Sequence, residues 1–445
     1  MLHWRLMAFK IKISLLSILL VMIVGCKTSI KKQTIIPAAD IDTAVRRMTD
    51  IMVHDVTNPP LAARFFAYAF LAGYEVVAEN NSSFKNMKGI LKDYPSIEKP
   101  RIKNYNYQLA SLLAIIETAG RIQPSGKWLR DLKDKILSNT ANNLNEETLT
   151  GSVKYASSIA DQIMKYARED GYRKFSDYPR YTPMNGDGYW FPTPPGYIAA
   201  VEPYFNKLRP FFLDSCSQFI PNSPVAFDKN KSSAFYTLMD SVYERGKNLN
   251  REQQEIAAFW DCNPFAINDQ GHLKVGIKKI SPGAHWMGIA GIACTQKNVS
   301  FDSSMMIHTL LALTLTDAFI CCWDEKYRSN RIRPETAIRK YIDPEWKPFL
   351  QTPPFPEYLS GHSVISAASA EVLSHFFGDT FAYKDSVEQD FGLPARSFHS
   401  FREAAQEAAV SRYYGGIHFT DAIQNGLIQG EKVGKHALFT FLKTK

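Results

Sequence analysis

The 445-residue sequence has only six cysteines, and none of them forms a CxxC pair. Five remain beyond Cys26, an odd number that cannot all pair, and we expect no metal site made of cysteines. Cys321 and Cys322 stand in an apolar stretch and are expected to be buried thiols. The chain also lacks a long basic run interleaved with aromatic residues, although its formal charge is +8, which argues against nucleic acid as a partner.

Acidic residues are absent from residues 1–25, where basic residues up to Lys12 precede the apolar run Ile13–Val24. That run has the length of the hydrophobic region of a secretory signal and is too short for a stable membrane span. It ends at Gly25-Cys26, and a small residue directly before a cysteine resembles a bacterial lipobox. We therefore expect residues 1–25 to be a lipoprotein signal peptide, starting at Met1 or Met7, with Cys26 lipidated.

The expected mature protein is exported and is anchored to a bacterial membrane through Cys26, facing the periplasm or the cell surface. Residues 26–40 form the predicted tether between the lipid and the folded protein. The alternative interpretation is an ordinary signal peptide that is followed by an incidental cysteine. The sequence does not indicate an oligomeric state.

An alternating strand pattern with hairpin turns is missing after Ile41, where the spacing of apolar residues is mostly helical. We predict an all-α fold of two packed helical bundles, an N-terminal bundle over residues 41–250 and a C-terminal bundle over residues 251–445 that carries the site. Helices are expected at 40–56, 60–80, 103–120, 125–138, 145–169, 197–213, 230–248, 251–260, 284–296, 303–328, 334–341, 357–377, 399–412 and 418–442.

The most apolar run after the signal segment is Ile307–Trp323. His308, Thr309 and Asp317 interrupt it, and such side chains are costly inside a bilayer. We therefore predict a buried core helix here and not a membrane span.

Three short blocks near the C-terminal end contain the candidate chemistry. In the first block, Lys326 and Arg333 are two cations seven residues apart, on nearly the same helix face if the helix persists. Pro334 follows Arg333 and predicts a helix start. This block is weak on its own, because cations at a helix end are usually only solvated charges.

The second block runs from Phe355 to Ser363, and its Ser360-Gly361-His362 opens a predicted helix. Ser360 is a natural N-cap, and Gly361 lets the backbone approach a ligand closely. The free N–H groups of a helix start favour an anion, and His362 would lie beside that anion and exchange protons with it. The same pattern also suits a capped helix with a surface histidine.

In the third block, Arg412 ends one predicted helix, Gly415-Gly416 marks a break, and His418 begins the next helix. Asp421 lies three residues further on the same face, where a carboxylate could fix the imidazole tautomer and raise its basicity. The alternative is a helix–turn–helix joint with a solvated His–Asp pair. Glycines then recur every fourth residue and predict a ridge for close helix packing: Gly426, Gly430 and Gly434.

Taken together and in this order, the three blocks resemble the signature of the type 2 phosphatidic acid phosphatase and vanadium haloperoxidase superfamily. The likeness departs from that signature at Leu359, where the family usually has proline, and at Asp421, which often stands four residues after the histidine. A looser likeness to the soluble bacterial haloperoxidase branch touches most of the chain through these segments: His54-Asp55, Asn58-Pro59-Pro60, Trp190–Pro195, Phe259-Trp260, Trp323 and Phe355.

The resemblance implies a role for each residue of the three blocks. His362 would be the acid–base histidine, and His418 would bond the central atom, as a phosphohistidine nucleophile or as the vanadium ligand. Three cations and backbone donors can neutralise an oxyanion and its five-coordinate transition state. The oxyanion oxygens would be bound by five residues: Lys326, Arg333, Ser360, Gly361 and Arg412.

The resemblance leaves three functions open. The first is a vanadate-dependent haloperoxidase that oxidises halide with hydrogen peroxide, which the length of a soluble double bundle favours by family analogy. The second is an acid phosphatase, a phosphomonoesterase that acts through phospho-His418 and requires no cofactor. The third is an inactive oxyanion-binding lipoprotein. The expected partners are the phosphate or vanadate oxyanion, a small-molecule substrate and the membrane, while the halide and any organic substrate are not indicated.

Overall fold

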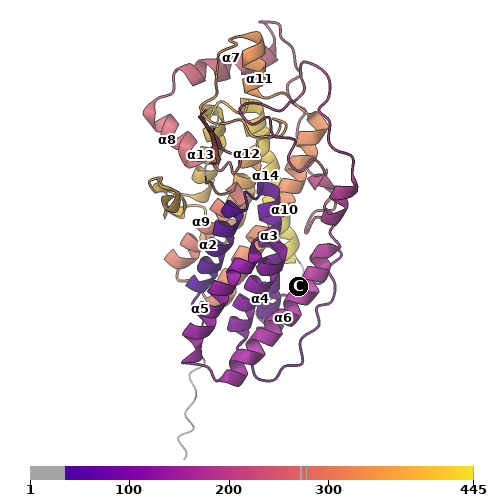
Figure 1. The fold of residues 1–445 in the computed structure, drawn as a ribbon, viewed down its shortest axis with the longest axis vertical. Coiled ribbons are helices and arrows are strands. Elements are labelled where there is room, and N and C mark those ends of the chain that lie inside the picture. Colours follow the sequence, from indigo (N-terminus) through magenta and orange to yellow (C-terminus); the bar gives the residue numbers. More distant parts are fainter. Residues whose placement is uncertain (1–35, 271–272, 277, 444–445) are drawn as a thin grey trace, which may run out of the picture. The chain divides into compact units, whose positions relative to one another are not determined.

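The computed structural model describes residues 36–270, 273–276 and 278–443. Residues 36–445 form one compact unit, and within its described part the chain folds into thirteen α-helices, α2 to α14. The all-α prediction is therefore confirmed (Figure 1). The predicted signal peptide, Cys26 and most of the predicted tether lie outside the described residues.

The first five helices pack along one another and against the later core. They are α2 (Ala39–His54), α3 (Pro59–Asn80), α4 (Tyr107–Ile122), α5 (Arg130–Ala141) and α6 (Glu146–Arg168). Two prolines open α3, and the Asn58 side chain caps it by accepting from the Leu61 amide at 2.9 Å. Because α3 packs against both α4 and α10, helices of the two predicted bundles share one core, and the boundary near residue 250 stays a prediction.

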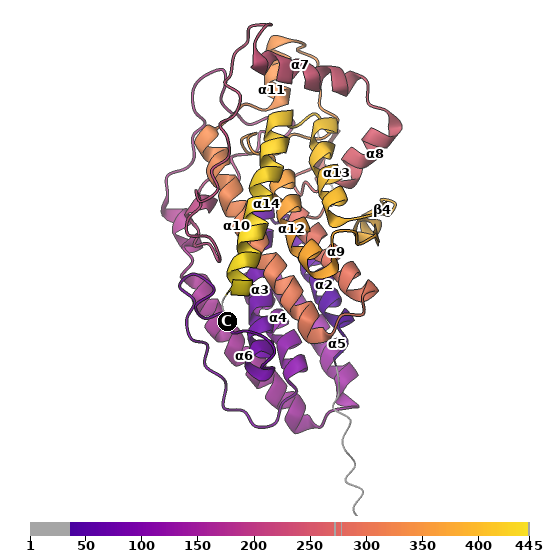
Figure 2. The same ribbon diagram turned by 180° about the vertical axis from the view of Figure 1, so that it is seen from behind.

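Eight further helices follow along the chain, and several of them contain or adjoin the three sequence blocks (Figures 1 and 2). They are α7 (Ala234–Lys247), α8 (Arg251–Phe259), α9 (Pro282–Gln296), α10 (Phe301–Ser329), α11 (Pro334–Tyr341), α12 (Gly361–Phe377), α13 (Phe401–Tyr414) and α14 (Thr420–Lys443). The central helix α12 packs against α10, α13 and α14.

Two short antiparallel hairpins accompany the helices. They pair β1 (Ile267–Gln270) with β2 (Leu273–Gly276), and β3 (Tyr383–Asp385) with β4 (Arg396–Phe398). Strands of three or four residues are too short for an alternating pattern to stand out, which is why the sequence did not indicate them.

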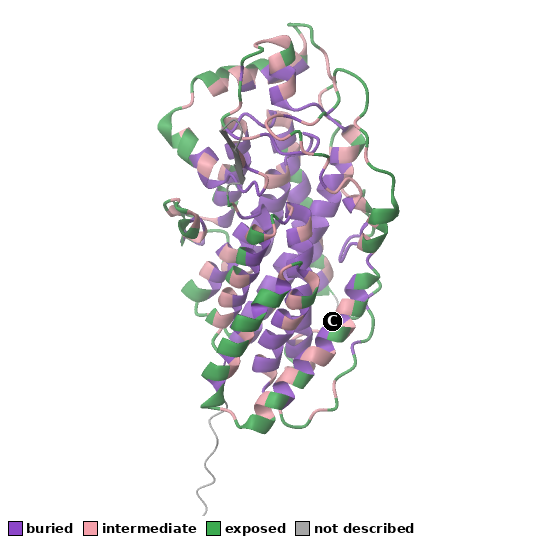
Figure 3. Ribbon diagram, viewed as in Figure 1, coloured by how far each residue is buried: buried purple, intermediate pink, exposed green. Residues whose placement is uncertain are grey.

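The predicted core helix is confirmed in α10, which is buried over nearly its whole length (Figure 3). By length and composition, α3 and α10 are apolar enough to cross a membrane, but 89% and 94% of their most apolar windows are buried inside the protein. Both are therefore accounted for as core helices, since apolar residues on every side of a helix indicate burial by other elements.

The glycine ridge brings α14 into close contact with α12. A Cβ atom added to Gly430 would lie 2.1 Å from the carbonyl oxygen of Val364, and one added to Gly434 would lie 2.8 Å from that of Ala368. These distances leave no room for a side chain. The ridge prediction is confirmed, and the contact holds together two helices whose N-terminal ends adjoin the candidate site.

The α-helix predicted at 197–213 is wrong, since this segment contains only the 3-10 turn η3 (Phe205–Lys207). Two prolines interrupt the segment, and its last three amides, of residues 211–213, donate to the Asp317 carboxylate of α10 at 2.7, 2.7 and 3.2 Å. An α-helix would use those amides in its own hydrogen bonds. Even with three donors, burial raises the pKa of Asp317 to about 7.

Candidate active site

The three sequence blocks meet at the ends of α10 and α13 and just before the starts of α11, α12 and α14. Lys326 lies in the last turn of α10, Arg333 is the residue before α11, and Ser360 is the residue before α12. Arg412 lies in the last turn of α13, and His418 lies in the connection from α13 to α14. Residues far apart in the sequence therefore converge on one place.

One pocket brings four of the predicted residues together. Gly361, His362, Arg412 and His418 line it, and aromatic side chains including Trp323 form much of the remaining wall. Lys326 and Arg333 lie behind this lining. Their cationic groups are 4.9 and 5.1 Å from the centre of the Phe355 ring, which also lines the pocket.

Each ring nitrogen of His418 lies within hydrogen-bond distance of a neighbouring side chain. Its Nδ1 lies 2.8 Å from Oε1 of Glu357, so a carboxylate accepts the Nδ1 proton and the lone pair is left on Nε2. Nε2 in turn lies 3.1 Å from Nη1 of Arg333. Burial, followed by the charges of Arg333 and Lys326, lowers the pKa of His418 well below its usual value. The geometry therefore presents a neutral imidazole whose bonding nitrogen faces the cations.

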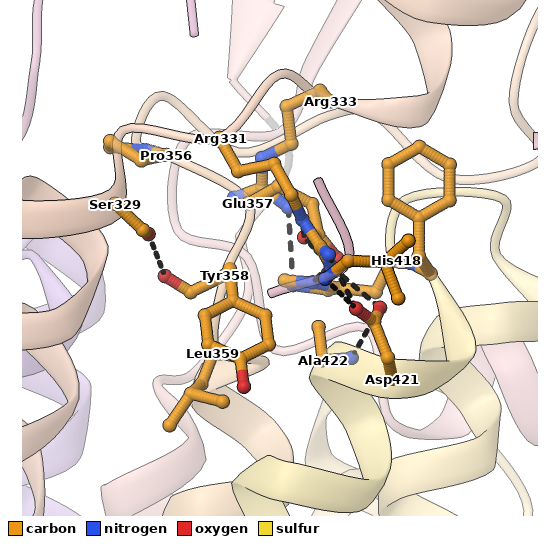
Figure 4. A network of polar contacts seen from close by, with 12 residues as sticks. Ser329, Arg331, Arg333, Pro356, Glu357, Tyr358, Leu359, His418, Asp421 and Ala422 are labelled. Carbon is orange, nitrogen blue, oxygen red and sulfur yellow. Dashed lines mark hydrogen bonds and ion pairs between the residues drawn. The ribbon is translucent and has the colours of Figure 1, made fainter. Parts of the chain in front are cut away.

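The predicted contact between His418 and Asp421 is wrong. Asp421 instead accepts two hydrogen bonds from Arg331, at 2.6 and 2.8 Å, and the partner of His418 is Glu357 (Figure 4). The imidazole lies in the connection before α14, which begins at Thr420, so helical spacing does not apply between positions 418 and 421. Arg331 also donates a hydrogen bond from Nε to Glu357 at 2.6 Å. Asp421 is therefore linked to His418 only indirectly, through Arg331 and Glu357.

The Glu357 carboxylate is the most connected group of this network. It is fully buried, and besides His418 and Arg331 it accepts a hydrogen bond from the Phe419 amide at 2.9 Å. A buried carboxylate with several donors is held in one orientation. Glu357 therefore sets both the orientation and the tautomer of His418, the role that the sequence assigned to Asp421.

Lys326 is held by the loop that leads to α12. Its ammonium group donates to the carbonyl oxygens of Pro356 at 2.9 Å and Glu357 at 3.2 Å, and also to that of Leu359. Burial, helped by the charge of neighbouring Arg333, lowers the pKa of Lys326 to about 7. A nearby anion favours the charged form of a buried lysine. Binding of an anion should therefore stabilise the ammonium form of Lys326.

The two arginines are each held by hydrogen bonds to neutral oxygens. Arg333 is buried and donates Nε to the Phe355 carbonyl and Nη1 to the Ile417 carbonyl, each at 2.9 Å. Arg412 is also buried, and its Nε donates to Ser411 Oγ at 3.0 Å. These backbone and hydroxyl contacts orient each guanidinium without neutralising it, so both keep their charge for a ligand.

The start of α12 has the predicted capped geometry. The Oγ atom of Ser360 accepts from the Ser363 amide at 3.4 Å and from the Ser363 hydroxyl at 2.8 Å. Ser360 is fully buried, whereas its neighbour Gly361 lines the pocket. The helix start thus points its first backbone groups towards the pocket, as an anion site requires.

His362 enters the pocket from the first turn of α12. Part of its side chain is accessible, but Nε2 is buried. Burial, followed by the charges of Arg412 and His418, lowers the pKa of His362 well below its usual value. Without an anion this histidine is therefore neutral near neutral pH, and it is able to accept a proton.

Two buried polar atoms at this site have no hydrogen-bond partner among the described residues, namely Nη2 of Arg333 and Nε2 of His362. Leaving such groups unpaired is costly, and an anion with several oxygens is able to bond both. Three cations, a helix start and two neutral imidazoles are the donor set for a tetrahedral oxyanion. The residues therefore fit vanadate or phosphate.

Glu357 and Arg331 are the functional residues that sequence reasoning missed. Glu357 lies three residues before Ser360, and Arg331 lies two before Arg333. Both stood inside the recognised blocks, where the signal at Glu357 was a charged residue among apolar neighbours, whereas Arg331 was one of several cations. Only the folded chain shows that they contact each other and His418.

Comparisons with known proteins show the family of this chain. A family model described as the VCPO second helical-bundle domain matches residues 341–444. No curated protein matches the chain. The crystal structure of a bacterial vanadium-dependent iodoperoxidase matches with 42% identity and a TM-score of 0.86, covering 92% of this chain and 97% of that one.

Crystal structures of a bacterial vanadium-dependent chloroperoxidase match at 16% identity. Its holo form has a TM-score of 0.65 and covers 87% of this chain and 93% of its own, and its apo form has a TM-score of 0.64 with 87% and 95% covered. At this identity the match shows the fold alone. The similarity to the iodoperoxidase is close and extends over nearly the whole of both chains. The protein therefore belongs to the vanadium-dependent haloperoxidase family and is a haloperoxidase-like enzyme with vanadate as its cofactor.

Proposed function

We propose that the enzyme uses hydrogen peroxide to oxidise iodide at a vanadate held by His418. Hydrogen peroxide is reduced to water, iodide is oxidised to hypoiodous acid, and one proton is consumed. The observation that carries the proposal is the neutral Nε2 of His418, which faces Arg333 while Nδ1 is held by Glu357. The choice of iodide rests on the similarity to the bacterial iodoperoxidase.

Each residue has a distinct task in this proposal. His418 bonds the central atom through Nε2, and Glu357 keeps the proton on Nδ1. Lys326, Arg333 and Arg412 neutralise the oxyanion, for which the orphaned Nη2 of Arg333 is one donor.

Ser360 and Gly361 extend the set of donors from the start of α12. When bound, vanadate supplies the Lewis-acid centre that makes the peroxide electrophilic. His362, with Nε2 unpartnered among the described residues, accepts a proton when hydrogen peroxide binds and returns it later. This assignment gives the two histidines different roles, although both are neutral.

The wall of the pocket suits a soft anion. Phe265, Phe319, Trp323 and Phe355 contribute to it. An anion that enters an apolar pocket loses part of its hydration shell. This loss costs the least free energy for iodide, because iodide is large and weakly hydrated. Iodide is also the most easily oxidised of the three common halides.

The decisive experiment compares the enzyme with and without vanadate. Protein freed of oxyanion should oxidise iodide only after vanadate is added, and chloride should be oxidised far more slowly. His418→Ala should abolish vanadium incorporation and iodide oxidation together, because it removes the bond to the central atom. A phosphatase would instead form an acid-labile phosphohistidine in the wild type, and His362→Ala would make that species accumulate.

Three results would count against the proposal. Full activity after His418→Ala contradicts the role of that histidine. Bromide or chloride oxidation faster than iodide oxidation contradicts the substrate. Absence of both activities, with or without vanadate, favours an inactive oxyanion-binding protein.

We also propose that the mature enzyme is attached to a bacterial membrane through lipidated Cys26, because a small residue and a cysteine close the apolar run of the signal segment. Mass spectrometry of the native protein should find a diacyl or triacyl group on an N-terminal Cys26. Cys26→Ala should release the enzyme into the soluble exported fraction. Cleavage at another position, or an unmodified Cys26, contradicts the anchor.

A further inference from the structure

A buried cluster of different ligand types lies beside the candidate active site. Cys262 follows α8, His285 lies in the first turn of α9, and Glu388 lies in the 3-10 turn η4 (Val387–Phe391). All three residues are buried, and their ligand atoms lie within 4.8 Å of one another. Cys262 also lines the active-site pocket.

The three separations match a tetrahedral zinc site. Sγ of Cys262 lies 3.5 Å from Nδ1 of His285 and 3.7 Å from Oε1 of Glu388, and that oxygen lies 3.2 Å from Nδ1. Zinc bonds of about 2.3 Å to sulfur and about 2.0–2.1 Å to nitrogen and oxygen place such ligand atoms about 3.3–3.6 Å apart at tetrahedral angles. The three separations are therefore within about 0.1 Å of those that a tetrahedral zinc ion requires.

The second nitrogen of His285 has the partner that metal-bound histidines usually have. Nε2 lies 2.8 Å from Oδ2 of Asp385, which is fully buried in β3. A carboxylate on the far nitrogen fixes the ring and raises the basicity of the nitrogen that faces the metal. The ring is also stacked on Trp260, with centroids 4.7 Å apart. His285 is therefore oriented with Nδ1 aimed at the cysteine and the glutamate.

We propose that Cys262, His285 and Glu388 bind a zinc ion, with Asp385 as the outer carboxylate. A thiolate, an imidazole and a carboxylate are the ligand types that zinc takes in proteins, and they leave a fourth position for a water molecule. The ion would join α9, η4 and the segment after α8, and would fix the pocket wall to which Cys262 belongs.

The competing state of the cluster contains protons in place of the metal. Burial alone lowers the pKa of His285, but Asp385 raises it well above its usual value, which gives an imidazolium between two carboxylates. Burial raises the pKa of Cys262 to about 11, which gives a thiol. A divalent ion with a thiolate and a neutral imidazole has the same net charge as this protonated cluster. Charge balance is therefore satisfied in both states, and direct measurement of the metal decides between them.

The first test measures metal in the full-length enzyme without a polyhistidine tag. Protein from cells grown with added zinc is washed with a weak chelator and analysed by inductively coupled plasma mass spectrometry. We expect one zinc ion per chain. Growth with cobalt should give the absorption bands of tetrahedral cobalt bound to a thiolate. Wild-type protein that carries neither metal after either growth overturns the proposal.

Matched variants locate the ion. Cys262→Ser should lose the zinc and the thiolate-to-cobalt band, whereas the control Cys321→Ala, which changes a buried thiol elsewhere, should keep both. His418→Ala should also keep the zinc, because it changes only the oxyanion site. Zinc that remains in full after Cys262→Ser and also after His285→Gln overturns the proposal.

A gentler variant keeps the test valid if a ligand variant does not fold. Asp385→Asn keeps the three ligands and changes only the outer carboxylate, so circular dichroism should show wild-type helix content. A zinc affinity about 10–100-fold lower in chelator competition is expected, as for other outer-shell changes. An unchanged zinc affinity in Asp385→Asn would contradict the site described here.

Discussion

Replacing Glu357 by glutamine tests the central correction to the sequence-based site. The carboxylate accepts from Nδ1 of His418 and from the Phe419 amide through one oxygen, and from Arg331 through the other. A carboxamide has one acceptor oxygen, so its NH2 group must face donors at one of the two ends. Every orientation of Glu357→Gln therefore breaks part of the network.

The two orientations fail for different reasons. If the amide NH2 faces Arg331, hydrogen bonds to a buried cation are lost, each of which contributes about 1.5–3 kcal/mol. If it faces His418, the imidazole must move its proton to Nε2, and the lone pair for the central atom is lost. We expect Glu357→Gln to weaken vanadate binding about 10–100-fold, or about 1.4–2.7 kcal/mol, and to lower the free energy of unfolding by about 3 kcal/mol.

Asp421→Asn is the matched control for this change. It also replaces a carboxylate that is paired with Arg331, but Asp421 has no contact with His418. We expect its vanadate affinity to fall by less than about threefold, since the effect must pass through Arg331. Calorimetric titration of vanadate into the oxyanion-free enzyme measures both variants. If Asp421→Asn weakens binding as much as Glu357→Gln, the assignment of Glu357 as the partner of His418 is refuted.

Three further predictions concern the cations and the packing of α12. Arg412→Ala should weaken vanadate binding by about 2 kcal/mol or more, because it leaves a buried anion half-paired, and unchanged calorimetric affinity would remove Arg412 from the pocket. Since burial lowers the pKa of Lys326 to about 7, the enzyme should lose vanadate affinity as the pH rises above about 7 and the ammonium deprotonates. Lys326→Met should lack that part of the pH profile, and identical profiles would contradict the shifted pKa. Gly430→Ala should lower the free energy of unfolding by about 2–3 kcal/mol in denaturant titrations, because its Cβ would lie 2.1 Å from the Val364 carbonyl oxygen. Gly283→Ala, whose Cβ has its nearest neighbour at 3.8 Å, should be tolerated, and equal losses in both variants would contradict the packing argument.

Local features of the sequence determined most of the helices and the candidate oxyanion residues. The proline that opens α11 and the Ser360 cap of α12 act within a few residues of their own positions, and the structure has them as predicted. The glycines of α14 also carried a readable signal, since small residues at every fourth position form a ridge along one helix face. Gly361, His362, Arg412 and His418 were found because they stand in short ordered blocks, and they line one pocket.

Only the tertiary structure decided which charged groups contact one another. Helical spacing made Asp421 the expected partner of His418, but the histidine lies before the helix begins, and Glu357 reaches it from another segment. The segment at 197–213 has no α-helix because the Asp317 carboxylate, more than 100 positions away, binds its amides.

The Cys262 cluster shows the same limit. Its residues come from three separate segments, and no spacing along the chain relates Cys262 to His285 or Glu388. Hydrogen bonds and ion pairs depend on distances of a few ångströms in space, and between distant segments these distances are set by helix packing. Sequence patterns show which reactive side chains each segment contains. The fold determines which of these side chains come into contact.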